Sequence, residues 1–266
     1  MEPDGGGPAP APPDPYAGRE RPSLLRRQLL RLRYEIGSVM RKYPGPYLAL
    51  ARRRHIGEPV TDETKLVIEG FPRSGNTFAV AAFGFAQPAS VRVARHEHAP
   101  AQVIEAARRG IPALVVIRAP EDAVLSFVIQ HPHIPMRQAL RAFVRFYEPL
   151  VPYRSSFVLA TFEQVTTDYG EVMRRVNRRF GTDFGVFEHT EENVLACIEE
   201  IDQDNRRVFG SGEALELMGA RPSERRSALK ARLRERYPVE VPPPLRARAE
   251  RVYGLLVTGS SRLERS

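Results

Sequence analysis

The stretch Lys65–Phe78, KLVIEGFPRSGNTF, joins a short apolar run to a compact polar loop and then to a second apolar run. The first run, Leu66, Val67 and Ile68, is typical of a buried strand, and the second is typical of a helix. In a strand–loop–helix unit, the backbone N–H groups of the first helical turn point out of the loop and attract anions. This stretch therefore predicts an anion-binding loop at the carboxyl end of a strand.

The loop itself supplies a cation, hydroxyl groups and a flexible backbone. Gly75 allows the backbone to approach a ligand closely, and Arg73 adds a fixed charge. The remaining members of the predicted binding loop are Ser74, Asn76 and Thr77. The loop is not a Walker A motif, because no Lys precedes its Ser or Thr. The alternative is an ordinary strand-to-helix turn in which Ser or Asn caps the helix.

Composition sets broad limits on the class of protein. The chain has 266 residues, 42% of them hydrophobic, which is enough for one large or two small domains. The net charge of +8 favours anionic ligands, although nearly all the cations are Arg, a bias that a GC-rich genome also produces. Cys197 is the only cysteine, so no disulfide can form within the chain, and we expect a cytoplasmic protein. A cysteine-rich zinc site is excluded.

The N-terminal region is predicted to contain a Pro- and Gly-rich tail over residues 1–21 and a basic helical arm over residues 22–60. An amphipathic helix begins near Ser23 and ends near Arg41, before Pro44. Its apolar residues lie on one face; they are Leu25, Leu29, Leu32, Ile36, Val39 and Met40. Such a helix either packs on the domain or makes peripheral membrane contact through residues 22–43. We expect packing.

Residues 61–258 alternate strands and helices and form the predicted main domain, with a short tail at 259–266. The alternation predicts a three-layer α/β fold, in which a parallel sheet like that of P-loop NTPases is flanked by helices. The part after residue 190 is predicted to be helical. Strands are expected at 65–70, 113–117 and 156–160, and helices at 76–86, 99–109, 120–130, 136–148, 169–180, 190–203, 223–236 and 244–257.

A second motif, IRAPEDAVLSFVI, follows the second predicted strand at residues 117–129. Arg118 is the first residue after the strand, and Ser126 lies about two turns along the next helix. An Arg at a strand end and a Ser on the following helix can hold one phosphate from two sides. The alternative is that Arg118 pairs with a nearby carboxylate and Ser126 has no binding role.

Together, PRSGNTF and IRAPEDAVLS resemble the two nucleotide-binding motifs of sulfotransferases that use 3′-phosphoadenosine 5′-phosphosulfate as donor. The resemblance covers about residues 65–185, and the segment 221–233 is similar to bacterial members. It implies that residues 73–77 hold the 5′-phosphosulfate, with Phe78 near the adenine, and that Arg118 and Ser126 hold the 3′-phosphate. The R-K-G segment of cytosolic members is missing; its possible substitutes are Arg221, Arg225 and Arg226.

The resemblance also implies a catalytic base in the segment RHEHAP, residues 95–100. His98-Ala99-Pro100 matches the local pattern of the cytosolic members, His96 matches better by distance from Arg118, and some members use Glu, here Glu97. We favour His98. Arg73 would stabilise the leaving group, and the scheme requires no metal. A helix-capping or surface role for these histidines is the alternative.

The function expected from these motifs is sulfuryl transfer to a hydroxyl group of a sugar, phenol or lipid acceptor, without a nucleic-acid partner. The segments expected to line the acceptor pocket are 84–100, 130–147 and 200–225. Three rival interpretations remain: a P-loop nucleotide kinase, a non-catalytic basic module that binds nucleotides or membranes, and a sulfotransferase fold without activity. The kinase would need a GK[ST] loop and a magnesium-binding Asp at a strand end.

Overall fold

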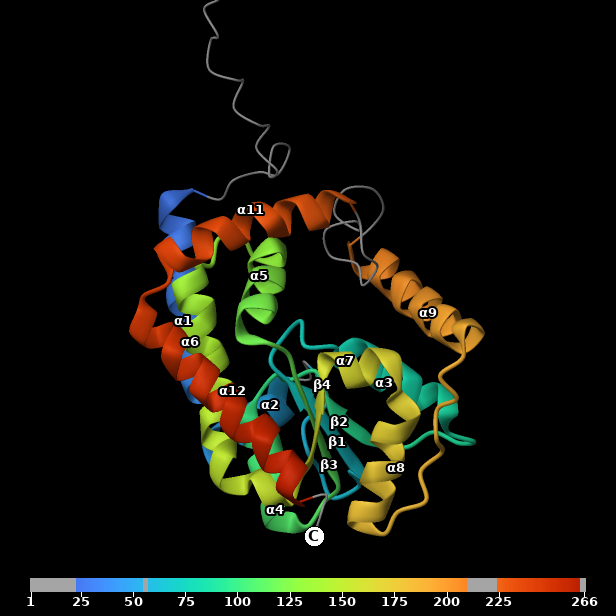
Figure 1. The fold of residues 1–266 in the computed structure, drawn as a ribbon. Coiled ribbons are helices and arrows are strands. Elements are labelled where there is room, and N and C mark those ends of the chain that lie inside the picture. The colour runs from blue at the N-terminus through green and yellow to red at the C-terminus, as the bar shows by residue number, and fades with distance from the viewer. Residues whose placement is uncertain (1–22, 55–56, 210–223, 264–266) are drawn as a thin grey trace, which may run out of the picture.

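A computed structural model describes residues 23–54, 57–209 and 224–263 (Figure 1). The predicted tail at 1–21 and the candidate Arg221 lie outside the described residues. Within the described ranges, every helix is too short or too polar to cross a membrane.

Four short parallel strands form the centre of the molecule, in the order β2-β1-β3-β4. The strands are β1 (Leu66–Gly70), β2 (Val93–Arg95), β3 (Ala113–Ile117) and β4 (Val158–Thr161). The chain passes from β1 to β2 on one side and then returns to place β3 on the other side of β1. This reversal makes the carboxyl ends of β1 and β3 the topological switch point, where ligands bind in open α/β sheets.

Helices cover both faces of the sheet, so the fold has three layers (Figure 1). Val67, Val115 and Ile117 point into one core and Ile68 and Val116 into the other, because side chains alternate along a strand. The first core is closed by α4 (Pro100–Arg109), α5 (Pro120–Gln130), α6 (Met136–Tyr147), α11 (Glu224–Glu240) and α12 (Pro243–Leu263). The second is closed by α3 (Asn76–Ala86), α8 (Tyr169–Phe180) and α9 (Glu191–Phe209). The predicted α/β class is confirmed.

The expected bounds of α3, α5 and α8 match the structure, whereas four short elements were missed or only partly expected. Pro44 does not simply terminate α1 (Leu24–Met40); it begins a second helix, at a position where the missing N–H of Pro costs nothing. The elements outside the predicted pattern are α2 (Pro44–Arg54), β2, the 3-10 segment η1 (Glu148–Ser156) and α7 (Phe162–Thr167). α12 also extends beyond its predicted end, to Leu263.

The helix α1 packs on the domain, beside α6, but with the face opposite to the expected one. Leu25, Leu29 and Ile36 are 73%, 58% and 55% exposed. The contacts with the domain come instead from the opposite side, where Tyr34 packs against Phe127 and Glu35 pairs with Arg141 and Arg145. The expectation that the apolar face of α1 is buried is therefore wrong, because hydrogen bonds and ion pairs determine the rotation of the helix.

Candidate functional site

The loop after β1 is held in shape by side chains that point into the protein. Ser74 is fully buried, and its hydroxyl lies 3.3 Å from the hydroxyl of Tyr147. Asn76 is also buried and donates to the carbonyl oxygens of Gly70 and Phe71 at 3.2 and 3.0 Å. The expectation that the Ser74 hydroxyl donates to a ligand is thus corrected, because this side chain and that of Asn76 are both taken up inside the protein. Their backbone N–H groups keep the predicted position at the start of α3.

The other predicted residues of the loop remain accessible. Gly75 precedes α3 with φ of 102°, in the left-handed region, and a Cβ there would lie 3.2 Å from the Phe162 ring. No side chain caps α3, so the N–H groups of its first turn face the loop. Thr77 is exposed, whereas Phe78 is partly buried and packs edge-on against Phe187. The loop therefore offers backbone donors and Thr77 to an anion.

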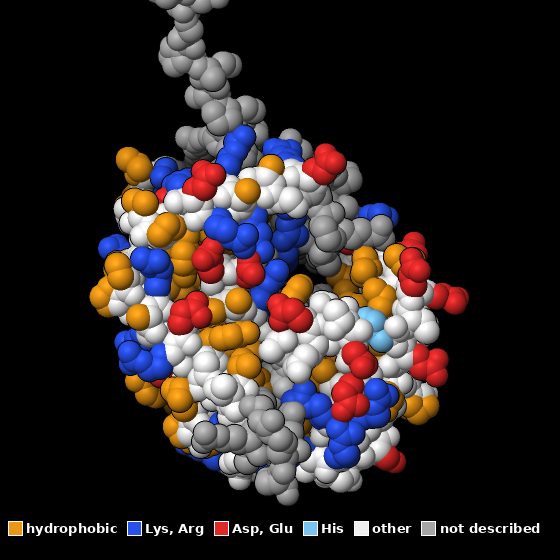
Figure 2. Space-filling view, in the orientation of Figure 1, with side chains coloured by type: hydrophobic (Ala, Val, Ile, Leu, Met, Phe, Trp, Pro, Cys, Tyr) orange, Lys and Arg blue, Asp and Glu red, His pale blue; other side chains and the backbone are white. Residues whose placement is uncertain are grey.

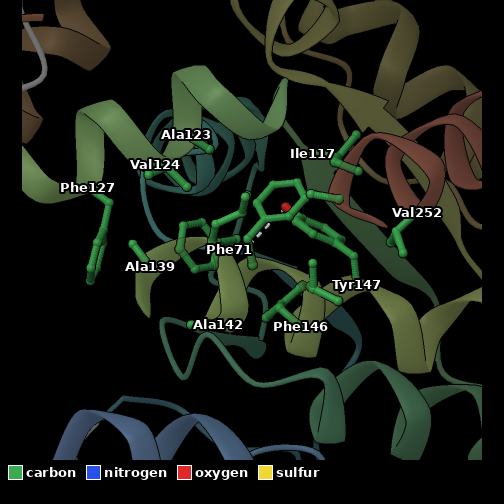
Figure 3. Packing of buried hydrophobic residues seen from close by; sticks show 14 of the residues in the cluster. Phe71, Ile117, Ala123, Val124, Phe127, Ala139, Ala142, Phe146, Tyr147 and Val252 are labelled. Carbon is green, nitrogen blue, oxygen red and sulfur yellow. Dashed lines mark hydrogen bonds between the residues drawn. The ribbon is translucent and has the colours of Figure 1, made fainter. Parts of the chain in front are cut away.

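Tyr147 of α6 fixes this loop to the sheet, a role that the local sequence did not indicate. Its hydroxyl accepts from the N–H of Phe71 at 3.0 Å (Figure 3). It also donates to the carbonyl of Val116 at 2.7 Å. The hydroxyl group thus joins the ends of β1 and β3 inside the core. Because all these groups are buried, their loss would leave polar atoms without partners.

We expect Tyr147→Phe to lower the free energy of unfolding by about 1–3 kcal/mol, the cost of leaving buried backbone groups unpaired. Urea denaturation followed by circular dichroism measures this change. Tyr43→Phe is the matched control, because Tyr43 is 51% exposed and should lose almost nothing. Equal stability of the Tyr147→Phe protein and the wild type would contradict the proposed role of the hydroxyl.

Two guanidinium groups contact Ser126 beyond the ends of β1 and β3, and a third arginine contacts the backbone beside them. Arg73 Nε and Arg226 donate to Ser126 Oγ at 3.2 and 3.3 Å. Arg118 donates to the carbonyl oxygen of Arg73 at 3.2 Å. The predicted residues Arg73, Arg118 and Ser126 are therefore in one cluster, which we call the arginine cluster together with Arg226. Figure 2 shows Lys and Arg side chains gathered below α11, beside a hollow in this face of the molecule.

The arginine cluster concentrates positive charge in a partly buried place. Burial, and then the nearby charges of Arg226 and Arg118, lower the pKa of Arg73 to about 9. Arg118 lies over the Phe162 ring at 3.9 Å, and its buried Nε has no hydrogen-bond partner among the described residues. Like charges held this close repel one another, so an anionic ligand would stabilise the arrangement.

Ion pairs between α11 and α5 bring Arg226 to Ser126, which lies 100 residues earlier in the sequence. Arg234 contacts Glu121 at 3.0 Å and Asp122 at 2.6 Å, and Lys230 contacts Asp122 at 2.6 Å. These contacts fix α11 across α5, with Arg226 one turn before Lys230 and above Ser126. Arg226, one of the proposed substitutes for the missing R-K-G segment, thus contacts Ser126.

His98 lies in a small pocket beside the loop after β1. The pocket is lined by Phe71 and Pro72 of the loop, by Tyr34 and Ser38 of α1, and by Arg41, which follows α1. The other lining residues are Pro100, Ala142 and Phe146. His98 Nδ1 lies 2.9 Å from the carbonyl oxygen of Gly70. Because a carbonyl only accepts, Nδ1 carries the hydrogen and Nε2 is left as the basic atom. Burial, and to a lesser degree the charges nearby, lower the pKa of His98 to about 4.

The other two candidate bases occupy different surroundings. His96 is exposed and its ring lies 6.3 Å from that of His98, outside the lining of the pocket. Glu97 is buried, and its carboxylate accepts a short hydrogen bond from the hydroxyl of Tyr47. Both histidines have positive φ, 61° for His96 and 48° for His98, which is uncommon for residues other than Gly. Backbone strain of this kind often accompanies functional sites.

A buried carboxyl group supports the segment that contains His98. Glu69 of β1 is fully buried, and its Oε1 accepts from the N–H of Glu97 and from Gln102, both at 3.0 Å. Oε2 has no partner among the described residues. Burial raises the pKa of Glu69 to about 8, so the group is mostly protonated at neutral pH. No pattern in the sequence distinguishes this residue from an ordinary strand residue.

The two shifted groups should give opposite dependences of stability on pH. His98 binds its proton more weakly in the folded state, so stability rises from about pH 4 to pH 6.5. Glu69 binds its proton more strongly in the folded state, so stability falls from pH 4.5 to about pH 8. Of these two groups, Glu69 is the one that still changes the unfolding free energy above pH 6.5.

We therefore expect the wild type to lose about 2 kcal/mol more unfolding free energy than Glu69→Gln between pH 6.5 and pH 8. Glutamine keeps the acceptor oxygen but cannot ionise. Denaturant unfolding of both proteins across this range measures the difference. Parallel curves for the two proteins would contradict the assignment of this titration to Glu69.

Comparisons with known proteins add a distant likeness to a solved structure. No protein-family model and no curated protein matches the sequence. Among solved structures, the chain is similar to mouse sulfotransferase SULT7A1 complexed with PAP, with 9% identity and a TM-score of 0.39. The match covers 79% of this chain and 95% of that one. A likeness of this size carries no argument about function, which therefore depends on the residues of the site.

Proposed function

We propose that this protein transfers a sulfuryl group from 3′-phosphoadenosine 5′-phosphosulfate to a hydroxyl group of an acceptor. The observation that carries the proposal is the arginine cluster at the carboxyl ends of β1 and β3. It joins two sequence motifs that each resemble a phosphate-binding motif of sulfotransferases. A donor with phosphate at both ends of one nucleoside matches two phosphate-binding motifs at neighbouring strand ends.

The residues divide between the two ends of the donor. The N–H groups at the start of α3, with Thr77 and Arg73, would bind the 5′-phosphosulfate. Arg118, Ser126 and Arg226 would bind the 3′-phosphate. The planar guanidinium of an arginine suits phosphate oxygens because it donates two parallel hydrogen bonds. Phe78 and Phe162, which flank the loop, are the aromatic residues nearest to a bound adenine in this assignment.

The acceptor would present its hydroxyl group to His98. Its hydroxyl oxygen attacks the sulfur of the donor and forms an O–S bond, while the bond from sulfur to the 5′-phosphate oxygen breaks. His98 Nε2 takes the hydroxyl proton, and the leaving group is adenosine 3′,5′-bisphosphate. The low pKa of His98 keeps the ring neutral and able to accept this proton. The negative charges of a bound donor would raise that pKa and strengthen the base.

Arg73 is placed to stabilise the charge that develops on the leaving phosphate. It lies at the end of β1, between the first turn of α3 and Ser126. A fixed cation at the position where charge develops lowers the barrier, because it needs no reorganisation during the reaction. Positioning of the two substrates supplies the remaining catalysis in this proposal.

A transfer assay tests the proposal directly. The full chain is incubated with donor labelled at sulfur and a panel of sugars, phenols and lipids that carry hydroxyl groups. The proposal expects label on at least one acceptor class and release of one adenosine 3′,5′-bisphosphate for each transfer. Transfer of the γ-phosphate of ATP to any of these acceptors, with label retained on the sulfur donor, would instead identify a kinase and contradict the proposal.

A further inference from the structure

The outer face of α1 is an apolar stripe that no other described element covers. Its central residues follow a spacing of three or four, so they lie in one row along the helix. Their exposed fractions range from 55% to 73%; the residues are Leu25, Leu29, Leu32 and Ile36. Met40 and Tyr43 continue the row, at 36% and 51% exposed. Side chains of this kind are usually buried, so the stripe needs a partner.

The polar face of α1 is fixed to the domain, and the stripe cannot turn inward. Arg31 Nε donates to the carbonyl oxygen of His133 at 2.7 Å, and Gln138 donates to the carbonyl oxygen of Arg31 at 2.7 Å. Arg145 contacts both Glu35, at 2.7 Å, and the hydroxyl of Ser38, at 2.9 Å. Because these contacts are spread over two turns of α1, they define its rotation and leave the stripe outward.

The charges around the stripe indicate what kind of partner it fits. Arg26 and Arg33 are exposed along one edge of the stripe. The only acidic residue of α1 is Glu35, which faces inward to Arg141 and Arg145. A second copy of the chain would bring these arginines against like charges, whereas an anionic lipid surface would attract them.

We propose that α1 is a membrane-surface helix, which inserts Leu25, Leu29, Leu32 and Ile36 among lipid chains and places Arg26 and Arg33 at anionic headgroups. The helix lies in the plane of the surface, and the domain stays on the aqueous side. Its inner face lines the His98 pocket, so the bound membrane lies about 10 Å from that pocket, the diameter of one helix. In Figure 1, α1 lies behind α6 on the left of the molecule, and α8 lies at the lower right.

Vesicle flotation with the full chain tests this proposal. We expect binding to vesicles of mixed phosphatidylcholine and phosphatidylglycerol, and much weaker binding to phosphatidylcholine alone. Replacing Arg26 and Arg33 by Gln should weaken binding to the anionic vesicles about 25-fold, which is about fivefold for each lost charge. Added salt should have the same effect, because it screens the headgroup charge.

A triple Leu→Gln variant tests the apolar part of the contact, and a matched triple variant controls for the loss of exposed apolar residues elsewhere. The stripe variant changes Leu25, Leu29 and Leu32; the control changes Leu195, Val239 and Leu255, which are 52%, 87% and 52% exposed on other helices. We expect the stripe variant to lose flotation and the control to retain it. Equal flotation of the two variants, or no flotation of the wild type, would overturn the proposal.

Light scattering on the same proteins distinguishes a second copy of the chain as the occupant. A wild-type dimer that becomes a monomer in the stripe variant, without vesicle binding, would also overturn the proposal. Because none of these measurements uses donor or acceptor, their failure would leave the proposed sulfuryl transfer untouched. Melting temperatures of all variants, which should equal that of the wild type, show that the fold is retained.

Discussion

His98→Asn is expected to lower the turnover of sulfuryl transfer by roughly 10²- to 10⁴-fold, the usual contribution of a general base. Asparagine tolerates the left-handed backbone of this position, and its amide can still donate to the carbonyl oxygen of Gly70. The substitution therefore removes the basic Nε2 while it preserves the local structure. Initial rates with the acceptor found in the transfer assay measure the loss.

His96→Asn is the matched control, because His96 has the same backbone conformation but lies outside the pocket. We expect its turnover to stay within about threefold of the wild type, since no proton transfer depends on it. Affinity for adenosine 3′,5′-bisphosphate should be unchanged in both variants. The acid limb of the pH–rate profile should be present in the wild type and absent in His98→Asn. A fully active His98→Asn protein would exclude His98 as the base.

Arg118→Ala is expected to weaken binding of adenosine 3′,5′-bisphosphate by roughly tenfold to a hundredfold, the effect of losing hydrogen bonds from a charged donor. Adenosine 5′-phosphate, which lacks the 3′-phosphate, should bind the variant and the wild type almost equally. This difference between two nucleotides assigns Arg118 to the 3′ end. Isothermal titration calorimetry measures both affinities.

Arg248→Ala controls for the loss of positive charge, because Arg248 pairs with Glu148 at the surface and is not part of the arginine cluster. Its affinity for the bisphosphate should match that of the wild type. If Arg118→Ala weakened both nucleotides to the same degree, Arg118 would belong to the 5′ end or to the fold, and the assignment of the second motif would be wrong.

The sequence predicted those parts of the structure that depend on local pattern. The helix over residues 76–86 follows an apolar run after a loop, and its predicted bounds match those of α3. Arg118 and Ser126 were expected in one site because the strand end and the following helix bring them together. In the structure, Arg226 of α11 also contacts Ser126. β2 was missed because three residues with no apolar alternation give no usable signal.

Local sequence pattern could not predict the features that depend on contacts between distant segments. No local pattern distinguishes Arg226 from the other two candidates, and its contact with Ser126 depends on the ion pairs of Arg234 and Lys230 that hold α11 on α5. Ser74 was expected to face a ligand because a hydroxyl in a loop suits phosphate, but Tyr147, distant in sequence, holds it inward. The inverted face of α1 has the same origin, since the partners of Glu35 lie on α6.

Calorimetric titration of the wild-type chain with adenosine 3′,5′-bisphosphate and with ATP tests the central claim most directly. The two ligands distinguish a pair of single-phosphate sites from a triphosphate site. We expect the bisphosphate to bind at least about tenfold more tightly than ATP, because one more charge-assisted hydrogen bond has an effect of this size. Equal affinity, or tighter binding of ATP, would contradict the assignment of the arginine cluster to a 3′-phosphoadenosine donor.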